Sequence, residues 1–220
     1  MKERTLTSSQ QQIVQMVAQI VAERMTGQQA GHGLDHVRRV VGLARYIHQR
    51  EGRGSRLIIE LAAWVHDVGD AKLHDGTERS EELVDDILQR AGVDRTTSAA
   101  IMHIVQNMSF RHRAIAQPLS IEGQIVQDAD RLDALGAIGI VRTVEYGAAR
   151  GQPFHVFPGE SDGGPTGRQH FFDKLLHLVQ SMHTETAREL GAQREQFMRS
   201  FLAQFDQEWS FGQSAWGQRS

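Results

Sequence analysis

Cysteine is absent from this 220-residue chain. Its absence excludes disulfide bonds, thiolate catalysis and cysteine-ligated zinc sites, so any metal ion must be bound by nitrogen and oxygen ligands. The eleven histidines are therefore the side chains of greatest chemical interest.

Long apolar runs, a strong net charge and a signal pattern are also missing. No stretch approaches the roughly 20 apolar residues of a membrane span, and the N-terminus lacks a basic-then-apolar pattern. The formal net charge is -3, with 23% charged and 40% hydrophobic residues, which gives no general attraction to nucleic acid or acidic membranes. We expect a cytoplasmic protein with no nucleic-acid or membrane partner.

Strand-like alternation is scarce, whereas apolar residues recur at helical spacing along the chain. The length suits one domain with a sizeable core. We expect an all-α, single-domain helical bundle over residues 1–220, with its core at about 10–209 and a frayed tail at 210–220. Within it, the apolar segment 57–68 reads as a central helix.

Other local signals concern helix ends and one loop. Asp35, Asp94 and Ser120 are candidate N-caps, and Ser120 precedes what reads as one long helix through Ile138. Glycine and proline are concentrated further on, which predicts a mobile loop at about 151–168. Whether this loop closes over a substrate stays open.

The stretch AAWVHDVGD begins as a buried helix and ends with His66, Asp67 and Asp70. On a helix, His66 and Asp67 lie about 100° apart, close enough to share one cation, and Asp70 lies one turn beyond His66. A buried carboxylate needs a cation, a hydrogen-bond network or exposure at a helix end. This stretch alone is equally compatible with a metal site and with a solvated helix end.

Two distant segments offer further ligands. GLDHV places His36 at the start of an amphipathic helix, and QDADRLD places Asp130 and Asp133 one helical turn apart. Asp133 could be a hydrogen-bond acceptor, a salt-bridge partner or, in a rotated helix, itself the ligand.

The order His, then His-Asp, then Asp, each on a helix, resembles the HD-domain metal-dependent phosphohydrolase superfamily. The contexts IELAAWVHD, KLHDG, MSF, QDADRLDALGAIGI and KLL with MHTETAREL are similar to one bacterial subgroup of small stand-alone HD hydrolases, over roughly residues 10–209. This resemblance implies an HD-domain helical bundle whose metal ligands are His36, His66, Asp67 and Asp130.

Two imidazoles and two carboxylates suit Mn²⁺, Fe²⁺, Co²⁺, Ni²⁺ or Zn²⁺, and also Mg²⁺ if more waters stay bound. An ion there would activate water, so no nucleophilic side chain is needed. We expect a phosphohydrolase acting on a phosphorylated small molecule, by preference a nucleotide, as a pyrophosphohydrolase or a nucleotidase. A weakly catalytic metal- and nucleotide-binding sensor or partner-binding module is the alternative, and a homodimer is compatible with either.

Further residues are candidates for catalysis and substrate binding. Asp70 could orient or deprotonate the attacking water, and Lys72 could bind phosphate or protonate a leaving oxygen. Lys72, His74, Arg111 and Arg142 are the candidate substrate-binding residues. Plain structural or surface roles are the alternative for each of them.

Three other HD-type activities fit less well. The chain lacks the GYP signature of the HD-GYP cyclic dinucleotide phosphodiesterases and the Glu-Asp pair of the alarmone hydrolases. A two-metal oxygenase of the HD type needs extra histidines, for which only His74 and His103 are candidates.

Overall fold

The protein is all-α, as the helical spacing predicts. The structure, a computed structural model, describes residues 5–25, 33–71, 74, 76–109, 116–157 and 164–216, with side chains up to residue 212, and these ranges contain no strand. The helices are α1 (Ser8–Arg24), α2 (Leu34–Glu51), α3 (Arg56–Val65), α4 (Ser80–Arg90), α5 (Arg95–Asn107), α6 (Ile121–Asp133), α7 (Gly136–Ala148), α8 (Gly167–Asp173) and α9 (Glu185–Trp216), with short 3₁₀ turns η3 (Leu175–His177) and η4 (Val179–Ser181).

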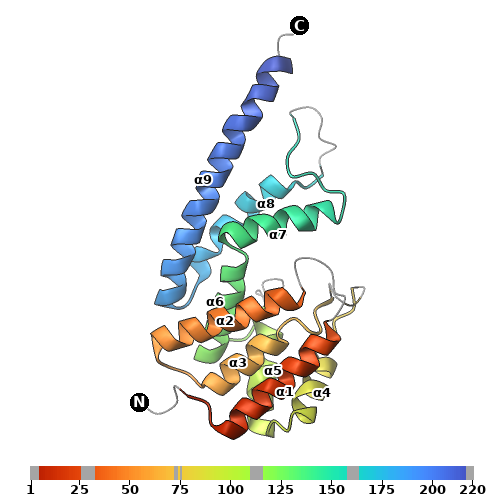
Figure 1. Ribbon diagram of the computed structural model, residues 1–220, viewed down its shortest axis with the longest axis vertical. Coiled ribbons are helices and arrows are strands. Elements are labelled where there is room, and N and C mark those ends of the chain that lie inside the picture. The colour runs from red at the N-terminus through yellow and green to blue at the C-terminus, as the bar shows by residue number, and fades with distance from the viewer. Residues whose placement is uncertain are drawn as a thin grey trace.

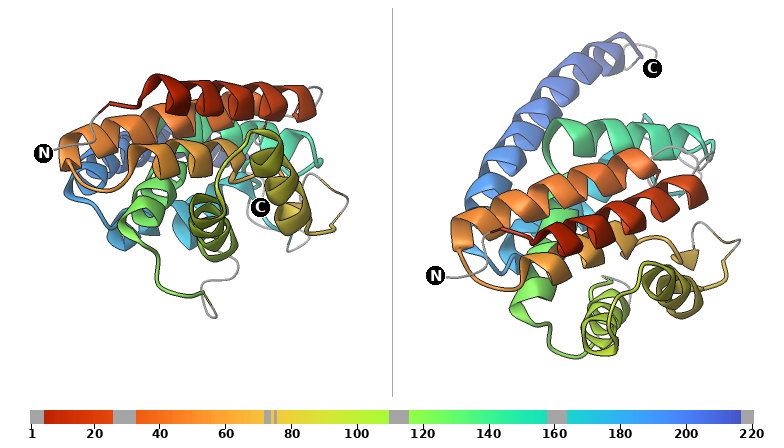
Figure 2. Two further views of the ribbon diagram at one scale, coloured as in Figure 1. Left: turned by 90° about the horizontal axis from the view of Figure 1, so that it is seen from below. Right: turned by 60° about the horizontal axis from the view of Figure 1, so that its bottom comes forward.

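The helices form two groups joined by α6. Figure 1 shows α1 to α5 in the lower half of the molecule, α7 to α9 in the upper half, and α6 passing between them. Helix α6 packs on α2 and α3 below and on α7 and α9 above. The C-terminal half of α9 extends beyond the other helices (Figure 2). Residues from α6 can therefore meet residues from both groups.

Helix α3 is the central helix, as its nearly continuous apolar sequence predicts. It packs against α1, α2, α5 and α6, and Ile59, Leu61 and Val65 are fully buried. The one buried charge on it, Glu60, accepts hydrogen bonds from Arg45 at 2.5 Å and from Arg56 at 2.6 Å. A helix surrounded on several sides is a rigid support for the residues that follow it.

The predicted long helix from Ser120 through Ile138 is wrong, because the chain breaks after Asp133. Leu135 is extended, and Gly136 has φ +72°, a left-handed value that favours glycine. A Cβ on Gly139 would lie 2.2 Å from the Ala134 carbonyl oxygen. The glycines thus permit a sharp turn between α6 and α7, which brings α7 back beside the end of α6.

Two of the three predicted N-caps are confirmed. The Asp94 carboxylate accepts a hydrogen bond from Thr97 N–H at 3.0 Å, and the Ser120 hydroxyl accepts one from Gly123 N–H at 3.3 Å. Asp35 is not an N-cap, because α2 already begins at Leu34 and Gly33 is its N-cap residue.

The start of α9 depends on a carboxylate from another helix. Asp128 of α6 is fully buried and accepts hydrogen bonds from the N–H groups of His183 and Thr184 and from the Thr184 hydroxyl, at 2.8 to 3.1 Å. Thr184 in turn accepts a hydrogen bond from Ala187 N–H at 3.2 Å. Asp128 therefore joins α6 to the first turn of α9.

We expect Asp128→Ala to lower the free energy of unfolding by about 2 kcal/mol or more, since it leaves buried N–H donors without an acceptor. Urea unfolding measures the change. Asp94→Ala, which removes an exposed cap, is the matched control and should cost about 1 kcal/mol. Equal losses in the two variants would contradict the role given to Asp128.

The C-terminal part differs from two expectations. The described residues 151–157 and 164–166 are irregular, but α8 already begins at Gly167, inside the predicted loop. Helix α9 continues to Trp216, so the predicted frayed tail is wrong for residues 210–216, and residues 217–220 lie outside the described residues. Trp209 stacks on Phe205 with ring centroids 5.4 Å apart and contacts Phe157 at 4.7 Å. Among the described helices, none combines the length and apolarity of a membrane span.

Candidate metal centre

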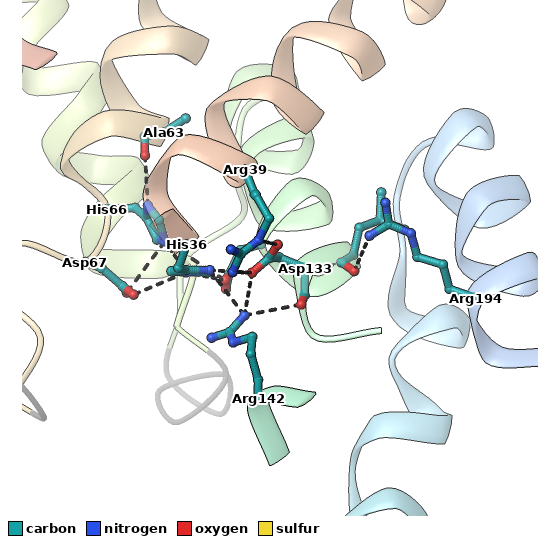
Figure 3. A network of polar contacts seen from close by, with 10 residues as sticks. His36, Arg39, Ala63, His66, Asp67, Asp133, Arg142 and Arg194 are labelled. Carbon is teal, nitrogen blue, oxygen red and sulfur yellow. Dashed lines mark hydrogen bonds and ion pairs between the residues drawn. The ribbon is translucent and has the colours of Figure 1, made fainter. Parts of the chain in front are cut away.

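Four predicted ligands from three separate segments meet at one point. His36 comes from the first turn of α2, His66 and Asp67 follow α3, and Asp130 lies on α6. His36 Nε2 lies 3.2 Å from His66 Nε2, 3.3 Å from Asp67 Oδ2 and 3.4 Å from Asp130 Oδ1. Figure 3 shows His36, His66 and Asp67 pointing toward one another.

The backbone after α3 differs from the expected continuous helix. α3 ends at Val65, and His66 keeps helical angles (φ -59°, ψ -32°) before the chain turns. Asp70 N–H donates to Asp67 O at 3.2 Å in a tight turn, so Asp70 is not one helical turn above His66. A Cβ on Gly69 would lie 2.2 Å from Ser80 N, so only glycine allows this close approach to α4.

His36, His66, Asp67 and Asp130 together are called the cluster below. The hydrogen bonds of the two imidazoles direct lone pairs into this cluster. His66 Nδ1 donates to Ala63 O at 2.9 Å, and His36 Nδ1 donates to Asp133 Oδ2 at 2.7 Å. With Nδ1 protonated in each ring, both Nε2 atoms carry a lone pair. Two lone pairs beside two carboxylates require a positive charge between them. His36, His66 and Asp67 could therefore hold a metal ion, and the nitrogen and oxygen donors fit a divalent one.

The acidic surroundings also shift pKa values. Burial lowers the pKa of His36, but its hydrogen bonds with Asp130, Asp133 and Asp67 outweigh this and raise the pKa to about 10. Burial raises the pKa of Asp130, yet the hydrogen bond from His36 and the charges of both imidazoles hold it below its usual range. Without a metal ion, a proton on His36 supplies the missing positive charge.

This proton predicts a pH dependence of stability in the metal-free protein. Because the folded-state pKa of His36, about 10, exceeds its ordinary value of 6.5, the stabilisation is complete below pH 6.5 and is lost as pH rises through 10. We expect urea unfolding of chelator-treated protein to show a steeper fall with pH in the wild type than in His36→Gln. Parallel pH profiles for the two proteins would contradict this expectation.

Asp133 connects the cluster to two arginines. Its side chain is 2% exposed; Oδ1 accepts from Arg39 Nε at 2.6 Å and Oδ2 from Arg142 Nη1 at 2.7 Å (Figure 3). Burial raises the pKa of Asp133, but the hydrogen bonds from His36 and Arg39 hold it well below the usual range. Asp133 faces Nδ1 of His36, on the side of the ring away from the cluster. The structure thus shows it as an acceptor and salt-bridge partner.

The cluster opens into a cleft of about 950 Å³. His66, Asp67 and Asp130 line it, and so do two other predicted site residues, Asp70 and Arg142. Its walls come from the residues after α3, the start of α4, the end of α5, and from α6, α7 and α8. Arg142 is on α7, the helix that follows the one carrying Asp130, and it reaches the site because of the turn at Gly136.

Other candidates lie elsewhere. His74 is not among the residues that line this cleft; it borders a separate cavity of about 570 Å³, and its Nε2 contacts Val68 O at 2.8 Å. The structure thus does not bring His74 into the lining of the cleft beside the cluster. His103 contacts Pro118 O at 3.1 Å, outside the cluster. Lys72 and Arg111 lie outside the described residues.

Arg39 is a site residue that the sequence interpretation missed. It lies one turn after His36 on α2, so its spacing was a usable signal, since residues three apart share a helix face. Its partner Asp133 is 94 residues away, and nothing in the sequence pairs the two.

An all-helical bundle with a histidine, an adjoining His-Asp pair and an aspartate from a later helix defines the class of HD-domain proteins. The family model of the HD domain matches residues 33–135. A curated relative, the uncharacterized protein YpgQ of Bacillus subtilis (strain 168), is 42% identical over 186 residues, which cover 84% of this chain and 87% of YpgQ. The chain belongs to the HD superfamily of hydrolases.

Solved structures agree with this assignment. The crystal structure of Bacillus subtilis YpgQ in complex with ADP has a TM-score of 0.76 at 35% identity and covers 91% of this chain and 96% of that one. A structure from Bacillus thuringiensis, described as an HD-superfamily hydrolase, has a TM-score of 0.72 at 35% identity, with 91% and 98% coverage. A structure from Lactobacillus plantarum has a TM-score of 0.78 at 33% identity, with 94% and 99% coverage.

Proposed function

We propose that the chain is a divalent-metal-dependent phosphohydrolase that acts on a nucleotide or a similar phosphorylated small molecule. The observation that carries the proposal is the meeting of His36, His66, Asp67 and Asp130 beside a cleft of about 950 Å³. That volume suits a nucleotide-sized ligand. The crystallisation of the relative YpgQ with ADP supports a nucleotide as the ligand class.

The two Nε2 atoms and the carboxylates of Asp67 and Asp130 would hold the ion. Mn²⁺, Fe²⁺, Co²⁺, Ni²⁺, Zn²⁺ and Mg²⁺ are all compatible with these donors. When bound, such an ion polarises a phosphoryl oxygen and lowers the pKa of a water molecule. Asp133 contributes by orienting His36, and the Ala63 carbonyl does the same for His66.

Other residues of the cleft have roles in substrate handling. Asp70 lies in the cleft lining next to the cluster and is our candidate for accepting the proton of the attacking water. Arg142, Arg131 and Lys174 also line the cleft and supply positive charge for phosphate groups. Lys72 and Arg111 stay candidates for the same task on the basis of their sequence positions.

Product analysis tests the proposal. Metal-stripped protein is reloaded separately with Mn²⁺, Mg²⁺, Ni²⁺ and Zn²⁺ and incubated with nucleoside mono-, di- and triphosphates. Pyrophosphate with a monophosphate identifies a pyrophosphohydrolase, and orthophosphate with a nucleoside identifies a nucleotidase. No product with any metal contradicts the proposal and favours a metal- and nucleotide-binding module.

A further inference from the structure

Helix α7 presents one face to the cleft and another to solvent. Gly139, Arg142, Thr143 and Tyr146 all line the cleft, and their spacing of three and four places them on one helix face. Val144 does not line the cleft and is 46% exposed. The cleft face of α7 is therefore a continuous wall.

This wall starts near the cluster of candidate metal ligands and leads away from it. Arg142 Nη1 lies 2.7 Å from Asp133 Oδ2 and 3.2 Å from His36 Nδ1, so it lies beside the imidazole whose other nitrogen, Nε2, faces the cluster (Figure 3). Tyr146 follows one turn later, about 6 Å further along the helix axis at 1.5 Å per residue. A ligand with its phosphates at the cluster would place the next part of the molecule against Tyr146.

Tyr146 is suited to bind a flat group. Of the described residues that line the cleft, it is the one with a phenyl, phenol or indole ring, and it is 37% exposed. The guanidinium of Arg150, which does not line the cleft, lies 3.7 Å from the ring centroid and covers one face of the ring. This cation–π contact holds the ring in place, so less conformational entropy is lost when a ligand stacks on it.

We propose that Tyr146 stacks on the nucleobase of a substrate whose phosphates bind at the cluster of His36, His66, Asp67 and Asp130. The proposal rests on the proposed function and adds to it the orientation of the substrate and the residue that selects a nucleotide over a phosphate ester without a base. Stacking on tyrosine tolerates every base, because each base has a π face. The predicted substrate class is therefore nucleotides with broad base tolerance.

Binding of ADP and of inorganic tripolyphosphate to Mn²⁺-loaded protein, measured by calorimetry, tests this proposal. We expect Tyr146→Ala to raise the Kd for ADP about tenfold, as loss of one base stack does, and to leave the Kd for tripolyphosphate unchanged. Tyr146→Phe retains the stack and should bind ADP within about twofold of the wild type. Val144→Ala, on the solvent face of the same helix, is the matched control.

Unchanged ADP binding by Tyr146→Ala, or equal weakening of ADP and tripolyphosphate, would overturn the proposal. A wild type that binds no ADP would overturn it as well. Because the readout is binding, it is separate from the product analysis. ADP binding that depends on Tyr146 without any turnover would contradict the proposed hydrolase activity and support the stacking role of Tyr146. Turnover by the wild type together with unchanged ADP binding by Tyr146→Ala would support the hydrolase activity and contradict the stacking role.

Discussion

Replacing His66 or Asp67 by alanine is expected to lower kcat by about 10³-fold or more, because the ion they would hold contributes several kcal/mol to the reaction. Both side chains belong to the group that could hold a metal, and His66 Nε2 lies 3.2 Å from His36 Nε2. Each variant should lose bound metal, measured by elemental analysis, and keep its helical circular dichroism spectrum.

His103→Ala is the control for these two variants. His103 is a helical histidine that contacts Pro118 O and lies outside the cluster, so kcat and metal content should stay at the wild-type level. Full activity in a metal-free His66→Ala protein would refute the metal-dependent mechanism. Lost activity with an unchanged metal content in Asp67→Ala would remove Asp67 from the ligand set.

Asp133→Ala is expected to lower the free energy of unfolding by about 3 kcal/mol, because it leaves the buried His36 and the part-buried Arg142 and Arg39 without a counter-charge. Arg39, Arg142 and His36 all donate to this carboxylate, whose side chain is 2% exposed. Metal affinity should also fall about 10- to 100-fold, since the hydrogen bond that orients His36 is lost. Urea unfolding and metal titration calorimetry measure the two effects.

Two further variants separate these effects. Asp133→Asn keeps the size and one acceptor oxygen for His36 Nδ1, so it should retain more metal affinity than Asp133→Ala. Asp35→Ala is the control for stability. It removes an 87% exposed carboxylate that pairs with Arg38 at 3.7 Å, and because such surface pairs contribute about 0 to 1 kcal/mol, the free energy of unfolding should fall by no more than that. Metal affinity of folded Asp133→Ala equal to that of the wild type would refute the positioning role of Asp133.

Local signals in the sequence predicted much of the fold. Continuous apolar residues identified α3 as the central helix, and the caps at Asp94 and Ser120 depend on contacts within three residues. The break between α6 and α7 was missed because apolar spacing continues through it, while the positive φ of Gly136 leaves no trace in that spacing. The extension of α9 past Trp209 depends on packing with Phe157, 52 residues earlier, which periodicity does not record.

Some residues of the site could likewise be located from the sequence, and others could not. The motif order brought His36, His66, Asp67 and Asp130 together correctly as a spatial group, although their role as ligands is still a proposal. The position of His74 depended on the turn that follows α3, where its ring contacts a backbone carbonyl. Neither this turn nor the packing of α2 on α6 that unites Arg39 with Asp133 follows from residue spacing alone.

Anomalous diffraction from crystals of the Mn²⁺-loaded protein would locate the bound ion. We expect an anomalous peak within about 2.3 Å of His36 Nε2, His66 Nε2 and the carboxylate oxygens of Asp67 and Asp130, the distance range of metal–ligand bonds. A protein that binds Mn²⁺ at another position, or leaves this cluster without a peak at saturating Mn²⁺, would contradict the claim that these four residues hold the catalytic ion.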